Sequence, residues 1–261
     1  MDVPIIPVER EYEPLGTGYS QSITVDGQDG KEYVAKGPTL VRNFRHVAAN
    51  ELVAAGLATK MGLPIPPYCI LSRGKKLYFG SNRQDRTNHH IGLDNGLLAR
   101  CSNIDKVYEL VVFDAWICNL DRHAGNFLVR CSGTVSSATK QCPAAEHNFM
   151  VIDHDDCLLP DDRDVTHFTG RLLATQVSEC IPLEFVRDQI MLPVRLGDAI
   201  RIAENISDEE IAKIINGVPV RWIPPEERPQ WAGFLISRRK LLRSLFIAER
   251  EIFGWLKAGE L

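Results

Sequence analysis

The chain has 261 residues, of which 44% are hydrophobic and 25% are charged, and its formal net charge is -4 at pH 7. This composition is ordinary for a packed globular protein, and the slightly acidic balance gives no reason to expect a nucleic-acid partner bound through phosphate neutralisation. The sequence contains no stretch near the roughly 18 apolar residues that a membrane span needs, and MDVPIIPVEREYEP lacks a secretory signal pattern, so we expect a cytoplasmic protein.

The first eighty residues predict a small antiparallel sheet that one helix interrupts. Short β-rich runs alternate with turn signals such as DGQDG and SRGK. These runs cover residues 22–25, 32–35, 68–71 and 76–79. Between the second run and the third, apolar residues recur at helical spacing from Arg45 to Met61, and Gly62 with a proline cluster ends the helix.

A polar stretch, SNRQDRTNHHIGLDNG, separates this part from a mainly helical remainder, and we place a domain boundary between residues 1–82 and 83–261. After the boundary we expect a helix over 104–118 that Ser102 caps, and then two strands over 127–130 and 148–153 that pair around a polar loop. Three helices follow: one over 194–205, one that begins with a Ser207–Glu210 capping box, and a long one over 226–257.

Polar residues of a kind that phosphoryl transfer uses gather in the middle of the chain. The segment Asn119-Leu-Asp-Arg-His-Ala-Gly-Asn126 lies between a predicted helix and a predicted strand, and Asp153 ends the next strand. Phosphoryl transfer needs one carboxylate to orient the attacking hydroxyl and oxygen ligands for Mg²⁺. Asp121 and Asn126 have the spacing of the catalytic-loop Asp and Asn of protein kinases, so this pattern predicts a kinase centre.

Two features near the N-terminus predict the same chemistry. Lys36 ends a β-rich run and Glu51 lies on the following helix, where kinases keep a phosphate-contacting lysine and its ion-pair partner. Upstream, Gly16 and Gly18 lie in a turn whose backbone amides could cover phosphates. Either residue of the Lys36–Glu51 pair is ordinary by itself, and their joint placement carries the prediction.

The combined pattern resembles the HipA-like kinases, in the wider group that contains the phosphatidylinositol 3- and 4-kinases. The matching motifs are the Asn50-Glu51 helix running into Gly62-Leu-Pro-Ile-Pro66, the Asn119-x-Asp-Arg-His-x-Gly-Asn126 loop, and Ile152-Asp153-His154 in place of Asp-Phe-Gly. The resemblance implies an α+β, two-lobed protein-kinase-like fold, with a small β-rich N-lobe that holds one helix and a larger, mainly helical C-lobe.

The resemblance also implies roles for individual residues. Asp121 would be the catalytic base, and His123 would hydrogen-bond a phosphate or position that base. The other implied sites are Mg²⁺ ligands at Asn126 and Asp153, an ATP-phosphate contact at Lys36 with Glu51 as its partner, and a loop over the phosphates with Gly16, Gly18 and Ser20. Ser20 and Ser22 have the Ser-x-Ser spacing of the autophosphorylation serines of some HipA-like toxins, although plain loop serines explain them more simply.

The expected function is an ATP- and Mg²⁺-dependent kinase that phosphorylates Ser or Thr of an unknown protein substrate, including itself. The alternatives are a phosphatidylinositol or other small-alcohol kinase, a nucleotide-binding pseudokinase, and a metal-dependent hydrolase using Asp121, His123, Asp153 and His154. The acidic segment that starts at Cys157 favours a soluble acceptor, and residues 154–156 are expected to be a solvated start to that segment. A regulatory partner or antitoxin is a further expectation, which the small size of the chain relative to full-length HipA weakens.

Overall fold

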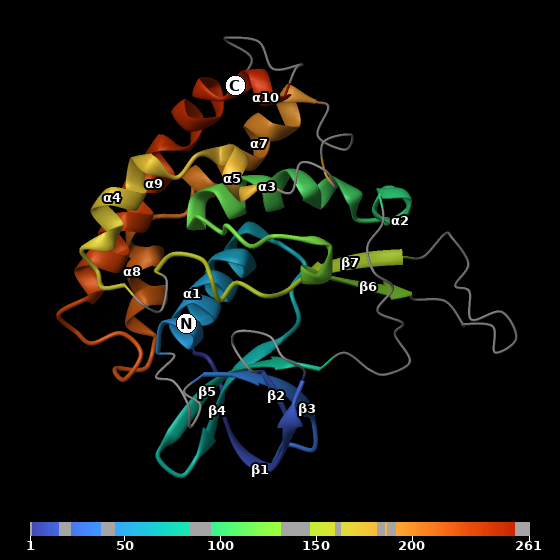
Figure 1. The fold of residues 1–261 in the computed structure, drawn as a ribbon, viewed down its shortest axis with the longest axis vertical. Helices are drawn as coiled ribbons and strands as arrows, with labels where there is room; N and C mark the ends of the chain where they lie inside the picture. Colours follow the sequence, from blue (N-terminus) through green and yellow to red (C-terminus); the bar gives the residue numbers. More distant parts are fainter. Residues whose placement is uncertain are drawn as a thin grey trace, which may run out of the picture.

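The computed structural model describes residues 2–15, 22–37, 45–83, 95–131, 147–159, 163–181, 186 and 192–253. The described elements form an α+β fold, as the sequence predicts. Figure 1 shows a strand barrel at one end of the molecule and most of the helices at the other, with one two-stranded hairpin at the side.

Five strands close the barrel in the order β1-β2-β3-β5-β4. Their bounds are β1 Ile5–Pro14, β2 Ile23–Gly27, β3 Glu32–Lys36, β4 Tyr68–Arg73 and β5 Lys76–Asn82. The last four overlap the predicted runs and end one to three residues later than predicted, whereas β1 was not predicted. It pairs antiparallel with β2 and, because the barrel closes, parallel with the distant β4, where Ile5 lies opposite Ile70.

Helix α1 (Arg45–Met61) has the predicted bounds and packs into the main hydrophobic core. Its residues 46–58 are all buried, so α1 lacks an exposed face over most of its length. It ends at Gly62, whose φ of 69° is in the left-handed region that favours glycine. Figure 1 shows α1 between the barrel and the helices of the C-terminal part.

The central segment consists of α2 (Asn95–Ala99), the short 3₁₀ turn η1 (Ile104–Lys106) and α3 (Val107–Ile117). Every α3 residue except Glu109 is buried, which makes this helix the centre of the core. The predicted cap was wrong, because the Ser102 hydroxyl donates to Asn148 Oδ1 (2.6 Å) instead of binding the start of the helix. Helix α2 was not predicted.

After α3 the chain makes the 3₁₀ turn η2 (Ala124–Asn126) and the antiparallel hairpin of β6 (Phe127–Cys131) and β7 (His147–Val151). Strand β7 ends two residues earlier than predicted, since Ile152 N donates to Asn126 O and Asp153 takes a φ of 65°. The loop that joins the two strands lies outside the described residues.

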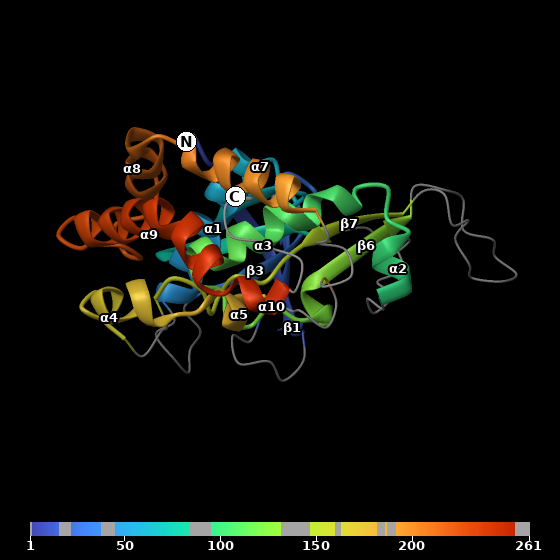
Figure 2. The same cartoon turned by 90° about the horizontal axis from the view of Figure 1, so that it is seen from above.

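The C-terminal part is helical, as predicted. Its helices are α4 (His167–Ala174), α5 (Val177–Cys180), α7 (Pro193–Glu204), α8 (Asp208–Asn216), α9 (Arg228–Ala248) and α10 (Arg250–Phe253), and Figure 2 shows α4, α8 and α9 together on one side. The Ser207–Glu210 capping box is confirmed, whereas α4 and α5 were not predicted. None of the helices within the described ranges has the length and apolar stretch that crossing a bilayer requires.

The helix predicted over 226–257 is broken at Glu249, and its last four predicted residues, 254–257, are not among the described residues. The Glu249 carboxylate accepts hydrogen bonds from the backbone amides of Val177 (2.6 Å) and Ser178 (3.0 Å). These are orphan N–H groups at the start of α5, so the side chain that lies at the break also caps another helix.

Candidate active site

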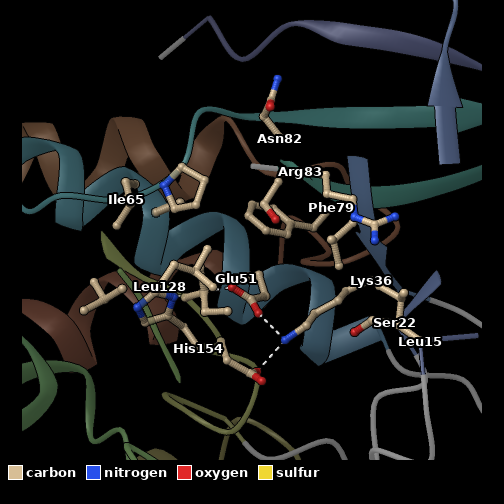
Figure 3. A pocket seen from close by; sticks show the side chains of 17 residues that line it. Leu15, Ser22, Lys36, Glu51, Ile65, Phe79, Asn82, Arg83, Leu128 and His154 are labelled. Carbon is tan, nitrogen blue, oxygen red and sulfur yellow. Dashed lines mark hydrogen bonds and ion pairs between the residues drawn. The ribbon is translucent and has the colours of Figure 1, made fainter. Parts of the chain in front are cut away.

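A pocket of ≈ 340 Å³ lies where the barrel, α1 and the β6–β7 hairpin meet. One wall is apolar and comes from strands of both sheets, from α1 and from the segment after it. The apolar lining residues are Leu15, Val34, Ala55, Ile65, Pro66, Phe79, Leu128, Val151 and Ile152. The other end is charged, and Figure 3 shows Lys36 and Glu51 pointing toward each other across it. A planar apolar group joined to an anionic one would find complementary surfaces here.

Lys36 is the centre of the charged end. Its Nζ donates to Glu51 Oε1 (2.6 Å), to Asp153 Oδ1 and to Asp155 Oδ2 (3.1 Å). The ammonium comes from the end of β3, Glu51 from the middle of α1, and the two aspartates from the segment after β7. Three parts of the chain that are far apart in sequence therefore converge on one cation.

Burial and charge act against each other in this cluster. Burial opposes the charged form of Lys36, but attraction by Glu51, Asp153 and Asp155 outweighs it, so the pKa of Lys36 lies well above its usual value. Burial would likewise raise the pKa of Glu51, yet Lys36 and a hydrogen bond from His154 lower that pKa to about 2. Both groups are therefore charged at neutral pH and form an ion pair.

The donors around Lys36 fit a divalent cation. Oxygen atoms of Glu51, Asp153 and Asp155 lie within 4.8 Å of one another, and carboxylate oxygens are ligands that Mg²⁺ prefers. The cluster has one negative charge per carboxylate against the single positive charge of Lys36. Asp153 is the most accessible of the three, with its side chain 35% exposed, so it is the best placed to share a cation with a bound phosphate.

The segment after β7 is packed into the protein, which differs from the solvated start expected for residues 154–156. His154 is 3% exposed and the Asp155 side chain 16%, and of these residues only Asp156 is exposed. The Asn50 side chain, on α1, donates to Asp155 O (2.7 Å) and Leu159 O (3.0 Å). Helix α1 therefore holds the segment after β7 in two ways: Asn50 binds the backbone of the segment, and Glu51 contacts the side chain of His154.

Buried charges fix the backbone of the loop after α3. The Arg122 guanidinium binds Asp114 in bidentate fashion, with Nε–Oδ2 at 2.9 Å and Nη2–Oδ1 at 3.0 Å, and both side chains are fully buried. Arg122 Nη1 also donates to Ile152 O (2.6 Å), next to Asp153. Arg122, for which the sequence indicated no role, thus ties the loop that carries Asp121 to the segment that carries Asp153.

The side chains on this loop differ in their freedom. Asn126 is 1% exposed and its amide nitrogen donates to Asp121 O (2.9 Å), which leaves the amide oxygen for another ligand. The side chains of Asp121 and His123 are 58% and 55% exposed, with Asp121 Oδ2 at 3.8 Å from His123 Nε2. Gly125 N donates to His123 Nδ1 (3.0 Å), so the ring is oriented from its other nitrogen.

The structure thus brings Lys36, Glu51 and Asp153 into direct contact, and it links Asn126 to Asp121 through the loop backbone. Gly16, Gly18 and Ser20 lie outside the described residues. The two described residues that flank them do meet, since Leu15 N donates to Ser22 O (2.8 Å), and both line the pocket. The catalytic and metal-binding roles of all these residues stay predictions.

Sequence reasoning missed the contacts of three residues in the site, of which only Asn50 belongs to a motif named above. Asp155 contacts Lys36, Asn50 anchors the segment after β7, and Asp114 pairs with Arg122. Asp114 could have been found, because an acidic residue in the middle of an otherwise apolar helix requires a buried partner. The contacts of Asn50 and Asp155 join residues more than one hundred positions apart, so no local pattern indicated them.

Comparisons with known proteins show the family and the fold of the chain. The family model for HipA-like kinases matches residues 8–245. The fold is similar to that of a proinflammatory kinase of Helicobacter pylori, CtkA, with TM-score 0.57 and 16% identity over 95% of this chain and 97% of the other. A chain in the Shewanella oneidensis MR-1 toxin–antitoxin complex of HipA, HipB and operator DNA has TM-score 0.53 and 13% identity over 92% and 67%. Curated proteins gave no match.

Proposed function

The chain belongs to the HipA-like kinase family, and from that premise we propose that it transfers the γ-phosphoryl group of ATP, with Mg²⁺, to a Ser or Thr hydroxyl of a protein, including itself. The observation that carries the proposal is the convergence of Lys36, Glu51 and Asp153 at the charged end of the pocket. A kinase needs this lysine–glutamate pair and the aspartate together, and a hydrolase built on the same aspartates would leave the pair without a role.

The pocket supports the nucleotide half of the proposal. Its apolar wall, which includes Val34, Ile65, Phe79 and Leu128, would enclose the adenine ring, and the ammonium of Lys36 would contact the α- and β-phosphates. Glu51 keeps that ammonium charged and oriented before ATP binds. A lysine already held in its ion pair does not have to be ordered when ATP binds, which favours fast and specific binding.

Asp121 would serve the acceptor half. Its carboxylate accepts the proton of the attacking hydroxyl while the hydroxyl oxygen forms a bond to the γ-phosphorus, the bond from that phosphorus to the β–γ bridging oxygen breaks, and ADP leaves. His123, 3.8 Å from Asp121, would orient the carboxylate or donate to the phosphoryl group. Mg²⁺, when bound, neutralises charge on the phosphates, and Asp153 with the amide oxygen of Asn126 would hold it.

The openness of the acceptor half supports a protein substrate over a small alcohol. Asp121 and His123 are each more than half exposed, so an extended polypeptide segment could reach them. Cys157, Leu158 and Leu159, the apolar start of the acidic segment, are buried, so they offer a lipid acceptor no apolar surface. The alternative to a protein acceptor is an inositol lipid or another small alcohol.

We also propose that the barrel with α1 and the remainder of the chain act as two lobes, divided between residues 82 and 83, with the nucleotide between them. The pocket draws its lining from both parts, which supports this arrangement. A partner is a further expectation: the HipA relative was solved with HipB, and whether this chain binds an antitoxin-like protein can be tested by co-purification from its source.

The direct test incubates the purified protein with Mg²⁺ and γ-labelled ATP, alone, with a generic protein substrate and with phosphatidylinositol vesicles. We expect label on protein for the wild type and none for Asp121→Ala or Asp153→Ala. Label only on the lipid would replace the protein-kinase proposal with the small-alcohol alternative. Nucleotide binding without any transfer would indicate a pseudokinase, and mass spectrometry of the labelled protein would show whether Ser20 or Ser22 is modified.

A further inference from the structure

His154 is a buried polar side chain that the proposed mechanism does not use. It follows Asp153 directly and is 3% exposed. Its Nδ1 lies 3.4 Å from Glu51 Oε2, and its ring meets Phe113 edge-on, with 5.6 Å between the ring centres and an angle of 80°. Within the described part of the chain, the other ring nitrogen, Nε2, has no hydrogen-bond partner.

The two oxygens of Glu51 therefore have different partners. Oε1 accepts from Lys36 Nζ at 2.6 Å, and Oε2 faces His154 Nδ1, while the Glu51 side chain is only 4% exposed. A carboxylate held at one oxygen can still rotate about its last bond, whereas one held at both oxygens presents a fixed lone pair to the lysine. Removing the second donor would also leave Oε2 buried and without its hydrogen bond, which is costly.

The contacts also indicate which ring nitrogen carries the proton. Oε2 can only accept, so the nitrogen facing it must donate, and the proton belongs on Nδ1. On a neutral ring, Nε2 then carries no hydrogen, and it is the nitrogen without a hydrogen-bond partner among the described residues. This tautomer therefore gives the Glu51 carboxylate its donor and leaves no N–H of a neutral ring without a partner.

We propose that His154 is a positioning residue that fixes the Glu51 carboxylate through Nδ1–H, so that Glu51 in turn holds Lys36 in the geometry that receives the ATP phosphates. The kinetic consequence rests on the proposed kinase function, but the positioning of Lys36 itself does not. The alternative is that His154 only fills space against Phe113. If His154 is a positioning residue, the position of Lys36 depends on the donor at Nδ1. If His154 only fills space, that position depends on the shape of the ring alone.

Three variants at this position separate these cases. His154→Phe keeps an aromatic ring and removes both nitrogens. His154→Asn places an amide N–H near the position of Nδ1, and His154→Gln, its matched control, places one near the position of Nε2. If the donor is what matters, we expect kcat/KM for ATP to fall about tenfold in the Phe and Gln variants and to stay within about threefold of wild type in the Asn variant.

A double-variant cycle then tests whether His154 acts through Glu51. In a Glu51→Gln background, we expect His154→Phe to lower kcat/KM by less than about twofold further, since the group that it positions is already altered. Equal losses in the Asn and Phe variants, or a full tenfold further loss in the Glu51→Gln background, would overturn the proposal and leave His154 as a packing residue.

A second readout does not require catalysis. Acetic anhydride labels free lysine amines, and mass spectrometry gives the labelling rate of Lys36 in the full chain without nucleotide. We expect labelling of Lys36 at least about threefold faster in the Phe and Gln variants than in wild type, and near the wild-type rate in the Asn variant. Identical rates in all variants would contradict the proposal. If wild type transfers no phosphate, the kinase proposal fails while this readout still decides the role of His154.

Folding is checked separately by the thermal unfolding midpoint of each variant. The Asn and Gln variants have similar polarity, so if the Phe variant does not fold, the comparison of these two carries the test by itself. Slower Lys36 labelling in the Asn variant than in the Gln variant supports the proposal, and the reverse order contradicts it.

Discussion

The two halves of the candidate site are built in different ways. Around Lys36 the charged side chains are packed against one another, and Lys36 and Glu51 are both nearly inaccessible to solvent. On the loop after α3 it is the backbone that is held, through the fully buried Asp114–Arg122 pair, while the side chains of Asp121 and His123 are mostly exposed. The half assigned to the nucleotide is organised in advance, and the half assigned to the acceptor is open.

This difference has a physical reason if the chain is a kinase. ATP is the same in every turnover, so fixed charges around it need no adjustment when it binds. An acceptor polypeptide must enter, react and leave, and it brings its own atoms to complete the environment of Asp121. Substitutions in the two halves should therefore have different effects on stability, on binding and on transfer, and this can be measured.

The sharpest way to separate the halves is Asp121→Asn, for which we expect the largest effect. Transfer of label from γ-labelled ATP should fall about 10³-fold, because the amide cannot accept the proton of the attacking hydroxyl. The dissociation constant for Mg·ATP should change less than about threefold, since Asp121 is not in contact with the nucleotide half. If nucleotide binding fell along with transfer, the two halves would not be independent.

Asp114→Asn should destabilise the protein by about 3 kcal/mol, because it leaves the buried guanidinium of Arg122 without its charge partner. The free energy of unfolding in urea measures this loss. Transfer should fall as well, since Arg122 ties the Asp121 loop to the segment of Asp153. A change below about 0.5 kcal/mol would mean that the pair does not hold the loop.

A pH series tests the charged state of Glu51. Its pKa is lowered to about 2 in the folded protein from an ordinary value of 4.5, so the stability that the carboxylate contributes is present above about pH 4.5 and is lost as the pH falls toward 2. At pH 7 we expect Glu51→Gln to be less stable than wild type by roughly 2 kcal/mol, and the difference should shrink between pH 5 and pH 3. A gap that does not depend on pH would contradict the ion pair.

The smallest effect is expected at the exposed pair of Lys60 and Glu210, which joins α1 to α8. Glu210→Gln should shift the thermal midpoint by no more than about 1 °C and leave transfer unchanged, because solvent screens this pair and the capping box keeps its hydrogen-bonding atoms. It is the matched control for Glu51→Gln, as both remove one carboxylate partner of a lysine on or next to α1. If Glu210→Gln lowered the stability as much as Glu51→Gln does, burial would not explain why the two ion pairs contribute differently.

The local elements of this fold could largely be predicted from sequence. Helix α1 has the predicted bounds because helical spacing, Gly62 and the prolines all agree, and Ser207 caps α8 as expected. The strand β1 was missed because charged residues interrupt its alternation and its partner β4 is more than fifty residues away. The last helix breaks at Glu249, whose carboxylate accepts from the start of α5, and no local pattern contains that contact.

The same division holds for the site. Lys36, Glu51 and Asp153 were predicted from spacing, and they meet in space. Asp155 and His154 were expected to be solvated, whereas Asp155 contacts Lys36 and is partly buried, and His154 contacts Glu51 and is buried; both partners are more than one hundred residues away. Sequence motifs therefore indicated the residues with expected chemical roles and Glu51 as the partner of Lys36, but not the contacts of Asp155 and His154 with this pair.

The most direct test of the central claim is a calorimetric titration of Mg·ATP into wild type, Lys36→Met and Asp121→Asn. If the buried half binds the nucleotide and the open half performs transfer, the wild type and Asp121→Asn will bind with dissociation constants within about threefold, and Lys36→Met will bind at least about tenfold more weakly. Equal binding by all three proteins, or no binding by the wild type, would contradict the assignment of the pocket to ATP.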